Sequence, residues 1–252
     1  MSKPDVKTDE KKQHFDDIYV AEDPVPYKER IMDALAYVSD NFNQQTFDRL
    51  ILPWAQQKAA QAPLNFVDLA GCFGNTTMAT LNGMDYDAIR NNWRDHEAAK
   101  QVDQPRRFAA NVTGIDISAN ALAYGESAGI YDATIEADLN EPEPATRQAV
   151  DKAMTDADIV ISTAALVYLE PAAVEKLLDA FASGSGEGYM LVNFLNPFAL
   201  EEADATKRML LDKLAFVGSM AARHRRMSEL EQANHPGEEW VLLEIWVLKR
   251  RG

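Results

Sequence analysis

The chain has 252 residues, enough for one α/β domain with an elaboration or for two small domains. Its formal net charge is −15 and its pI is about 4.7, so its surface repels phosphate backbones, and we expect no nucleic-acid substrate. The single cysteine, Cys72, excludes an internal disulfide, and the four histidines show no spacing typical of metal ligands, so we predict no metal site.

The chain lacks the features of a membrane or exported protein. No apolar run approaches the ~20 residues that span a bilayer. The amino end is charged and has no apolar signal core. We therefore expect a soluble, cytoplasmic protein that does not associate with membranes.

The amino-terminal quarter is expected to form a cap. Residues 1–13 are predicted to be disordered, and residues 14–27 to become ordered on contact. Apolar residues recur at helical spacing over 28–42 and again over 44–61, where Pro53 is expected to kink the helix. Because these segments precede the first strand, residues 1–62 are interpreted as a disordered tail and an N-terminal helical cap.

Strands and helices then alternate. Strands are predicted at 64–69, 111–117, 132–137, 157–163 and 188–194, and helices at 75–82, 119–128, 145–154 and 171–183. This alternation favours a mostly parallel sheet with helices on both faces. Residues 83–107 interrupt the rhythm and are interpreted as an insertion.

The carboxyl end is predicted to close the sheet with a hairpin. We expect a helix from Glu201 to about Met220, a strand over Arg223–Leu230, a turn at Pro236-Gly237, and a last strand over Glu239–Leu248. The near-continuous apolar run of the last strand indicates a position inside the sheet. The fold class is therefore α/β, with a seven-stranded, mostly parallel sheet, an antiparallel C-terminal hairpin strand, and residues 63–252 as the main domain.

A loop of small residues after the first strand is the strongest functional signal. The buried strand Phe66-Val67 meets Asp68, and a helix begins at Asn75. Between them lie the small residues Ala70, Gly71, Cys72 and Gly74. A strand, a tight loop and a helix N-terminus let the backbone approach a ligand closely, as in nucleotide sites.

Two further acids follow strands of the predicted sheet. Asp116 ends an apolar strand, where its carboxylate could accept two charge-assisted hydrogen bonds from a ribose diol. Asp138 follows the third strand and has an alternative interpretation as a cap of the next turn. The carboxyl ends of parallel strands share one edge of the sheet, so we expect these acids to be close to the small-residue loop.

These features together resemble class I S-adenosylmethionine-dependent methyltransferases, over about residues 63–252, and most closely the bacterial small-molecule type. The family has a Rossmann-like fold. The segments that carry the resemblance are Val67–Gly74, Thr113–Ser118, Glu136–Leu139, Ala157–Ala165 and the closing hairpin. Ile18-Tyr19, Asp23-Pro24 and Pro26-Tyr27 resemble the amino-terminal cap of that subgroup. The chain departs from the pattern at Ala70 and Cys72, where glycines are usual.

The resemblance implies S-adenosyl-L-methionine as the cofactor and a small-molecule methyl acceptor, with the methyl group going to O, N or C. The cofactor would contact Asp68, Ala70, Gly71, Cys72, Phe73, Gly74, Asn75, Asp116, Ile117, Ser118, Asp138, Leu139, Thr163 and Ala164. The acceptor would contact Tyr19, Tyr27, Tyr168, Asn193 and Asn196. Tyr168 or His14 could act as a base if the acceptor carries a proton.

Two other functions remain open from the sequence. A protein of this fold could bind S-adenosylmethionine without methylating anything, because methyl transfer needs no diagnostic side chain. An NAD(P)-dependent oxidoreductase shares the small-residue loop and the acid after the second strand, but the closing hairpin and the 48-residue gap from Asp68 to Asp116 argue against it. The cap helices could pair two chains in a homodimer. The basic segment Arg223–Arg226 is expected to be a solvated strand end.

Overall fold

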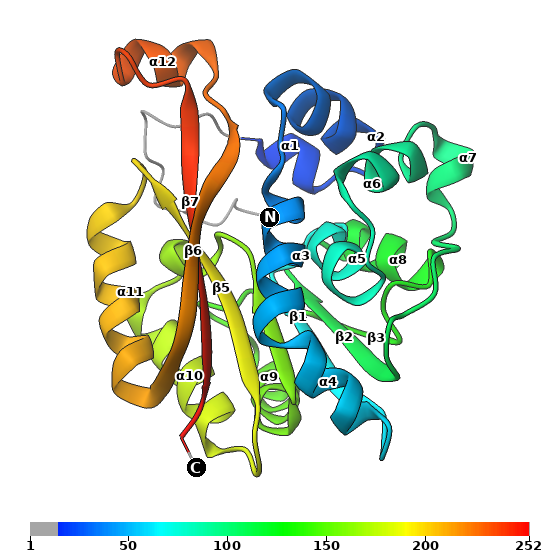
Figure 1. Cartoon of the computed structure of the whole chain (residues 1–252), viewed down its shortest axis with the longest axis vertical. Helices are drawn as coiled ribbons and strands as arrows, with labels where there is room; N and C mark the ends of the chain where they lie inside the picture. The colour runs from blue at the N-terminus through cyan, green and yellow to red at the C-terminus, as the bar shows by residue number, and fades with distance from the viewer. Residues whose placement is uncertain (1–14, 252) are drawn as a thin grey trace.

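A seven-stranded sheet forms the centre of the computed structural model, which describes residues 15–251 (Figure 1). Its strands are β1 (Leu64–Leu69), β2 (Ala110–Asp116), β3 (Ala133–Glu136), β4 (Ile159–Ser162), β5 (Tyr189–Asn196), β6 (Leu214–Arg226) and β7 (Trp240–Arg250). The order is β3-β2-β1-β4-β5-β7-β6; β7 is antiparallel to both β5 and β6, and the other pairs are parallel. The predicted fold class is confirmed, including the place of the last strand inside the sheet.

The sheet is buried on both faces, and its central strands are largely apolar. All four residues of β4 are buried. Successive side chains of a strand point to opposite faces, so Phe66 and Val67 of β1 belong to two different hydrophobic clusters. Each face therefore needs its own layer of helices.

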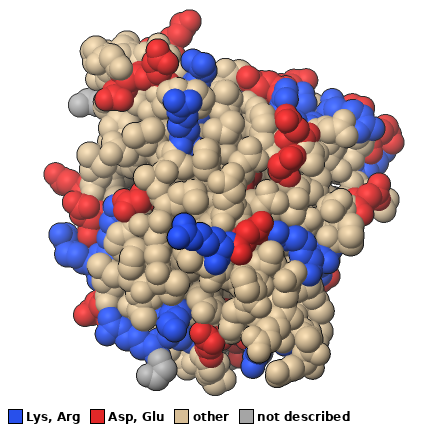
Figure 2. Space-filling view, viewed as in Figure 1, with Lys and Arg blue, Asp and Glu red and all other residues tan. Residues whose placement is uncertain are grey.

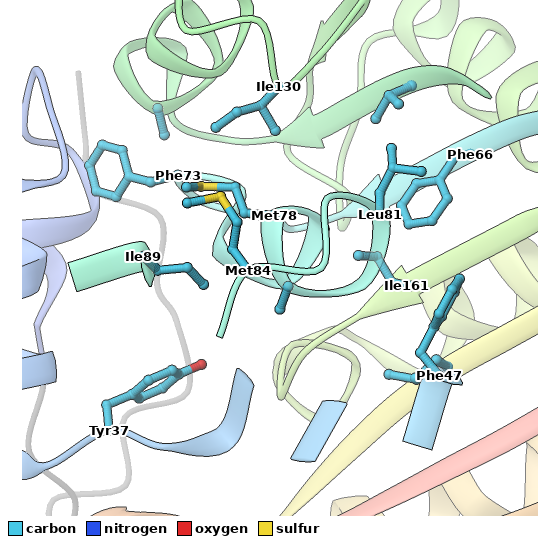
Figure 3. Packing of buried hydrophobic residues seen from close by; sticks show 14 of the residues in the cluster. Tyr37, Phe47, Phe66, Phe73, Met78, Leu81, Met84, Ile89, Ile130 and Ile161 are labelled. Carbon is cyan, nitrogen blue, oxygen red and sulfur yellow. The ribbon is translucent and has the colours of Figure 1, made fainter. Parts of the chain in front are cut away.

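Helices cover the two faces in two groups (Figure 1). One group is α9 (Pro144–Asp156), α10 (Pro171–Ser183) and α11 (Leu200–Lys213), with the short 3-10 helix η2 (Leu166–Tyr168) just ahead of α10. The opposite face carries α3 (Ser39–Leu50), α4 (Leu52–Ala59), α5 (Asn75–Leu81) and α8 (Ala119–Ser127). Figure 3 shows the packing around α5, with Leu81 near Phe66 and Met78 near Met84.

The amino-terminal segments divide between the sheet face and its carboxyl edge. Helix α3 packs on the face, with the Phe47 ring centroid 6.5 Å from that of Phe66. Ahead of it, α1 (Asp16–Tyr19), α2 (Val25–Tyr27) and the π-helical η1 (Lys28–Asp33) lie above the sheet edge (Figure 1). The helix predicted over 28–42 is broken, since Ala36 has a left-handed φ of 48°. Pro53 lies in the first turn of a separate helix, α4, where its missing N–H costs nothing.

The insertion at 83–107 forms two short helices, α6 (Tyr86–Asn92) and α7 (His96–Ala99). Trp93 follows α6 and is fully buried. Its ring meets those of Tyr27 and Phe73 edge to face at 5.9 and 6.4 Å, and its Nε1–H donates to the Tyr124 hydroxyl at 2.8 Å. This aromatic packing joins the insertion to the amino-terminal segment and to α8.

The prediction for the carboxyl end was wrong about where the helix gives way to the strand. Helix α11 ends at Lys213 and strand β6 begins at Leu214, whereas the helix was expected to reach Met220. Residues 214–222 include alanines and methionine, which favour helices, but pairing of β6 with β7 over most of its length overrides this preference. Part of the predicted strand is a helix, α12 (Glu229–Asn234), because Ser228 and Glu231 form a capping box.

Candidate functional site

A pocket of about 380 Å³ lies at the carboxyl edge of the sheet. Its walls come from the loops after β1, β2, β3 and β4, from residues 15–37, and from the end of β6. It is lined by Phe15, Asp16, Tyr19, Tyr27, Ile31, Tyr37, Asp68, Ala70, Gly71, Cys72, Asn75, Thr76, Asp116, Ile117, Ala137, Asp138, Leu139, Asn140, Thr163, Ala164, Ala165, Tyr168, Leu169, Leu195, His224 and Arg225. This is the edge where open parallel sheets bind ligands.

The loop after β1 has an unusual backbone. Ala70, Cys72 and Gly74 have φ values of 54°, 49° and 78°, all in the left-handed region. Glycine adopts this region freely, whereas other residues are strained there by roughly 1–3 kcal/mol. The loop geometry thus explains why glycine would suit positions 70 and 72. Because Ala70 and Cys72 stand there instead, backbone strain is stored beside the pocket.

Asp68 is buried under this loop. Its carboxylate accepts hydrogen bonds from the Thr77 hydroxyl at 2.7 Å and the Tyr131 hydroxyl at 3.0 Å. A Cβ atom placed on Gly71 would lie 2.3 Å from the Asp68 Cγ, so only glycine lets the loop rest on the carboxylate. Burial raises the pKa of Asp68 to about 7, and the two hydroxyl donors oppose this rise only in part.

Tyr131 reaches Asp68 because two glycines make room for its ring. A Cβ on Gly114 of β2 or on Gly125 of α8 would lie 2.6 or 2.3 Å from the Tyr131 ring. The ring is therefore held between a strand and a helix, and its hydroxyl is directed at the carboxylate. This pairing fixes the position of Asp68 before any ligand enters.

Asp116 and Asp138 lie further along the same edge. The Asp116 carboxylate accepts from the backbone N–H of Cys72 at 2.9 Å and of Ser118 at 2.8 Å, which links the ends of β1 and β2. Burial raises the pKa of Asp116, and these backbone donors work against the rise. Asp138 accepts from the Asn140 N–H at 3.0 Å. Each carboxylate keeps lone pairs for a ligand hydroxyl or amine.

Most of the predicted cofactor residues line the pocket, but three do not. Phe73 is fully buried among Tyr27, Trp93 and Tyr124. Gly74 caps α5, and Ser118 caps α8 with its side chain. Cys72 lines the pocket, and burial raises the pKa of its thiol well above the usual range, so the thiol stays protonated.

The predicted acceptor residues separate into two sets. Tyr19, Tyr27 and Tyr168 line the pocket. Asn193 is buried below it and donates to the Asn43 side chain at 3.0 Å, and Asn196 at the end of β5 is exposed. His14 lies outside the described residues.

Sequence reasoning missed the basic wall of the pocket. His224 and Arg225 were expected to be solvated, but they are 7% and 3% exposed. The two terminal guanidinium nitrogens of Arg225, Nη1 and Nη2, each donate to one oxygen of the Glu231 carboxylate at 2.7 Å. The charge run in the sequence was visible, but the direction of these side chains depends on pairing between β6 and β7.

A buried polar network supports the pocket from behind. The Asp40 carboxylate is fully buried and accepts from the Asn75 amide at 2.9 Å and the Thr76 hydroxyl at 3.3 Å. Burial raises the pKa of Asp40 to about 6. Thr76 also shares a 2.9 Å hydrogen bond with the hydroxyl of Thr163, which ties the loop after β4 to the start of α5.

Within residues 15–251, no three His, Cys, Asp or Glu side chains are grouped as metal ligands. None of the helices in this range is long and apolar enough to cross a membrane. Figure 2 shows acidic and basic side chains interspersed over the viewed face.

Comparison with known proteins identifies relatives in structure only. No protein-family model matches the chain, and no curated protein matches its sequence. Magnesium protoporphyrin IX methyltransferase from Synechocystis PCC 6803, crystallised with bound SAM, is 14% identical with a TM-score of 0.46, over 82% of this chain and 79% of that chain. The pyocyanin biosynthetic protein PhzM is 15% identical with a TM-score of 0.45, over 84% of this chain and 55% of that chain. Geranyl diphosphate C-methyltransferase from Streptomyces coelicolor A3(2) is 10% identical with a TM-score of 0.41, over 77% of this chain and 76% of that chain.

Proposed function

We propose that the chain is an S-adenosylmethionine-dependent methyltransferase that acts on a small molecule. One observation carries this proposal: Asp68, Asp116 and Asp138, from three successive strand ends, line one pocket with a loop of small residues. A cofactor with an amino group, a ribose diol and an adenine amine has three donors to offer to such a row of acceptors.

The residues present fit this cofactor. Asp116 would hold the ribose hydroxyls, Asp138 would lie near the adenine, and Asp68 with Gly71 would border the amino-acid end. Gly71 has no Cβ, which lets the loop rest directly on the Asp68 carboxylate. The exposed, apolar Ile117 borders the pocket beside Asp116, where it could cover a flat base.

The protein's contribution to such a reaction is mainly placement. When bound, S-adenosylmethionine supplies a methyl group on a positively charged sulfur, which an O, N or C nucleophile can displace. Correct orientation of two reactants is worth ~7–11 kcal/mol. Residues 15–37 contribute Phe15, Tyr19, Tyr27 and Tyr37 to the wall opposite the strand ends, and we propose that this segment excludes water as the cap.

Binding measurements test this proposal against an oxidoreductase. Titration calorimetry with S-adenosylhomocysteine and with NADH should detect binding of S-adenosylhomocysteine. Tight binding of NADH alone would contradict the proposal. The alternative function, cofactor binding without methyl transfer, is tested by mass spectrometry of a small-molecule panel. A mass gain of one methyl group on any acceptor would exclude it.

The remaining expectations stay proposals. The net charge of −15 supports the view that the chain does not bind nucleic acid. We retain the cytoplasm as its location, residues 1–62 and 63–252 as its two regions, and a homodimer as a possible assembly. Size-exclusion chromatography with light scattering would determine the oligomeric state.

A further inference from the structure

A β-bulge in β6 turns two consecutive side chains into the pocket. Arg223 pairs with Leu242 and Arg225 with Val241, so His224 is an extra residue on the bulged strand. Neighbouring side chains of a regular strand point to opposite faces, but His224 and Arg225 are both buried and both line the pocket. Bulges often re-aim side chains next to active sites.

His224 is held at the end of the pocket away from the three carboxylates. The acids follow β1, β2 and β3, whereas β6 is at the opposite side of the sheet. The Val38 N–H donates to the His224 carbonyl at 2.9 Å, and the Tyr37 ring meets the imidazole edge to face at 4.9 Å. If the nucleoside occupies the β1–β3 side, the acceptor must enter beside His224.

The charges at this end do not favour an anionic acceptor. The bidentate pair with Glu231 neutralises Arg225, and the Phe15 ring covers its guanidinium at 5.6 Å. Asp16 is a further acid in the wall. The rest of this wall is aromatic or apolar, which suits a neutral, ring-containing molecule; it includes Phe15, Tyr19, Tyr27, Tyr37, Tyr168 and Leu195.

His224 contributes an imidazole to the pocket wall, and imidazole is the side chain that most often acts as a general base. Imidazole ordinarily titrates between pH 5 and 8. Burial raises the pKa of Tyr27 and Tyr37 above the usual range, so both stay protonated and cannot act as bases. Among residues 15–251, the titratable and charged groups near this end of the pocket include Asp16, Tyr19, Tyr27, Tyr37, Tyr168 and Arg225 in its lining, with Asp40 close to Tyr37 and Glu231 paired with Arg225.

We propose that His224 is a catalytic base that removes the proton of a neutral phenolic hydroxyl, which makes the acceptor an aromatic O–H compound. This inference rests on the proposed function. The acceptor oxygen forms a bond to the methyl carbon while the carbon–sulfur bond breaks, with its electron pair going to sulfur. The hydroxyl proton moves to the imidazole and from there to solvent, so the products are the methyl ether, S-adenosylhomocysteine and one proton.

A chromophoric phenol tests this assignment without a known substrate. The probe is 4-nitrophenol, whose absorbance reports its own ionisation, added to protein saturated with S-adenosylhomocysteine. We expect the bound probe to ionise at a pH about one unit below that of the free probe, because its proton is shared with imidazole. His224→Gln should abolish this shift and bind S-adenosylhomocysteine within about threefold of the wild type.

The control variant is His96→Gln, which changes an exposed histidine on α7 outside the pocket lining and should leave the shift intact. Should His224→Gln fail to fold, diethyl pyrocarbonate labelling of the wild type tests the same contact. Bound 4-nitrophenol should slow the modification of His224 by this reagent several-fold. An unchanged shift in His224→Gln, no protection of His224, or no probe binding would overturn the inference. Failure of S-adenosylhomocysteine itself to bind would instead overturn the proposed function.

Discussion

Substitution of Gly71 by alanine should damage both folding and ligand binding through Asp68. The added Cβ would lie 2.3 Å from Cγ and 2.4 Å from both carboxylate oxygens, whereas ordinary contact begins near 3.4 Å. Asp68 is 1% exposed and its carboxylate is held by Thr77 and Tyr131, so the carboxylate cannot turn away from position 71 without losing these hydrogen bonds. Either the loop or the carboxylate must move by about 1 Å.

The expected cost follows from the two hydrogen bonds that hold Asp68. A movement of this size breaks or stretches the bonds of 2.7 and 3.0 Å from the two hydroxyls. Hydrogen bonds to a charged group contribute about 1.5–3 kcal/mol each. We therefore expect Gly71→Ala to lower the free energy of unfolding by about 3 kcal/mol, and to weaken binding of S-adenosylhomocysteine at least tenfold.

Urea denaturation and titration calorimetry measure the two effects. Gly218→Ala is a matched control, because its Cβ would meet only the flexible end of Leu50 at 3.1 Å, and it should cost less than about 1 kcal/mol. The double variant Asp68→Ala/Gly71→Ala should be about as stable as Asp68→Ala alone, since the clash is gone. Additive losses in the double variant would refute this reasoning.

Four further outcomes are expected. Asp116→Asn should weaken S-adenosylhomocysteine binding about 10–100-fold by calorimetry, because the proposed charge-assisted bonds from Asp116 to the ligand would be lost. Ala70→Gly should raise the free energy of unfolding by roughly 1 kcal/mol by relieving the positive φ, whereas Ala79→Gly inside α5 should lower it by a similar amount. The folded-state pKa of Asp68, about 7, is above the reference value of 3.8, so its contribution to stability is full below pH 4 and is lost as the pH rises through 7. The Asp68→Asn variant has no such group to titrate. Its free energy of unfolding, measured with urea, should therefore rise by roughly 2–4 kcal/mol relative to the wild type between pH 4 and pH 7. Glu231→Ala should cost about 3–5 kcal/mol in thermal or urea unfolding, because it leaves a buried arginine unpaired.

Strands and helices with a strong local pattern were predictable, whereas those whose conformation depends on pairing with a distant strand were not. The strands up to β5 and the inner place of β7 follow from their apolar runs. The boundary at Lys213 was missed because Ala221 and Met220 favour a helix locally, and only pairing with β7 makes this segment a strand. Similarly, Phe73 has the sequence position of a pocket residue but is buried in an aromatic cluster formed by distant segments.

The amino-acid sequence alone determined the alternation of strands and helices up to β5, the small-residue loop, and the acids at the strand ends, because each depends on neighbours only a few residues away. The tertiary structure decided which groups meet at the pocket, since Tyr131 holds Asp68, Asp40 holds Asn75, and His224 lines the wall, all from distant parts of the chain. It also decided how readily the carboxylates hold a proton. Burial sets that property, and burial exists only after the layers have packed together.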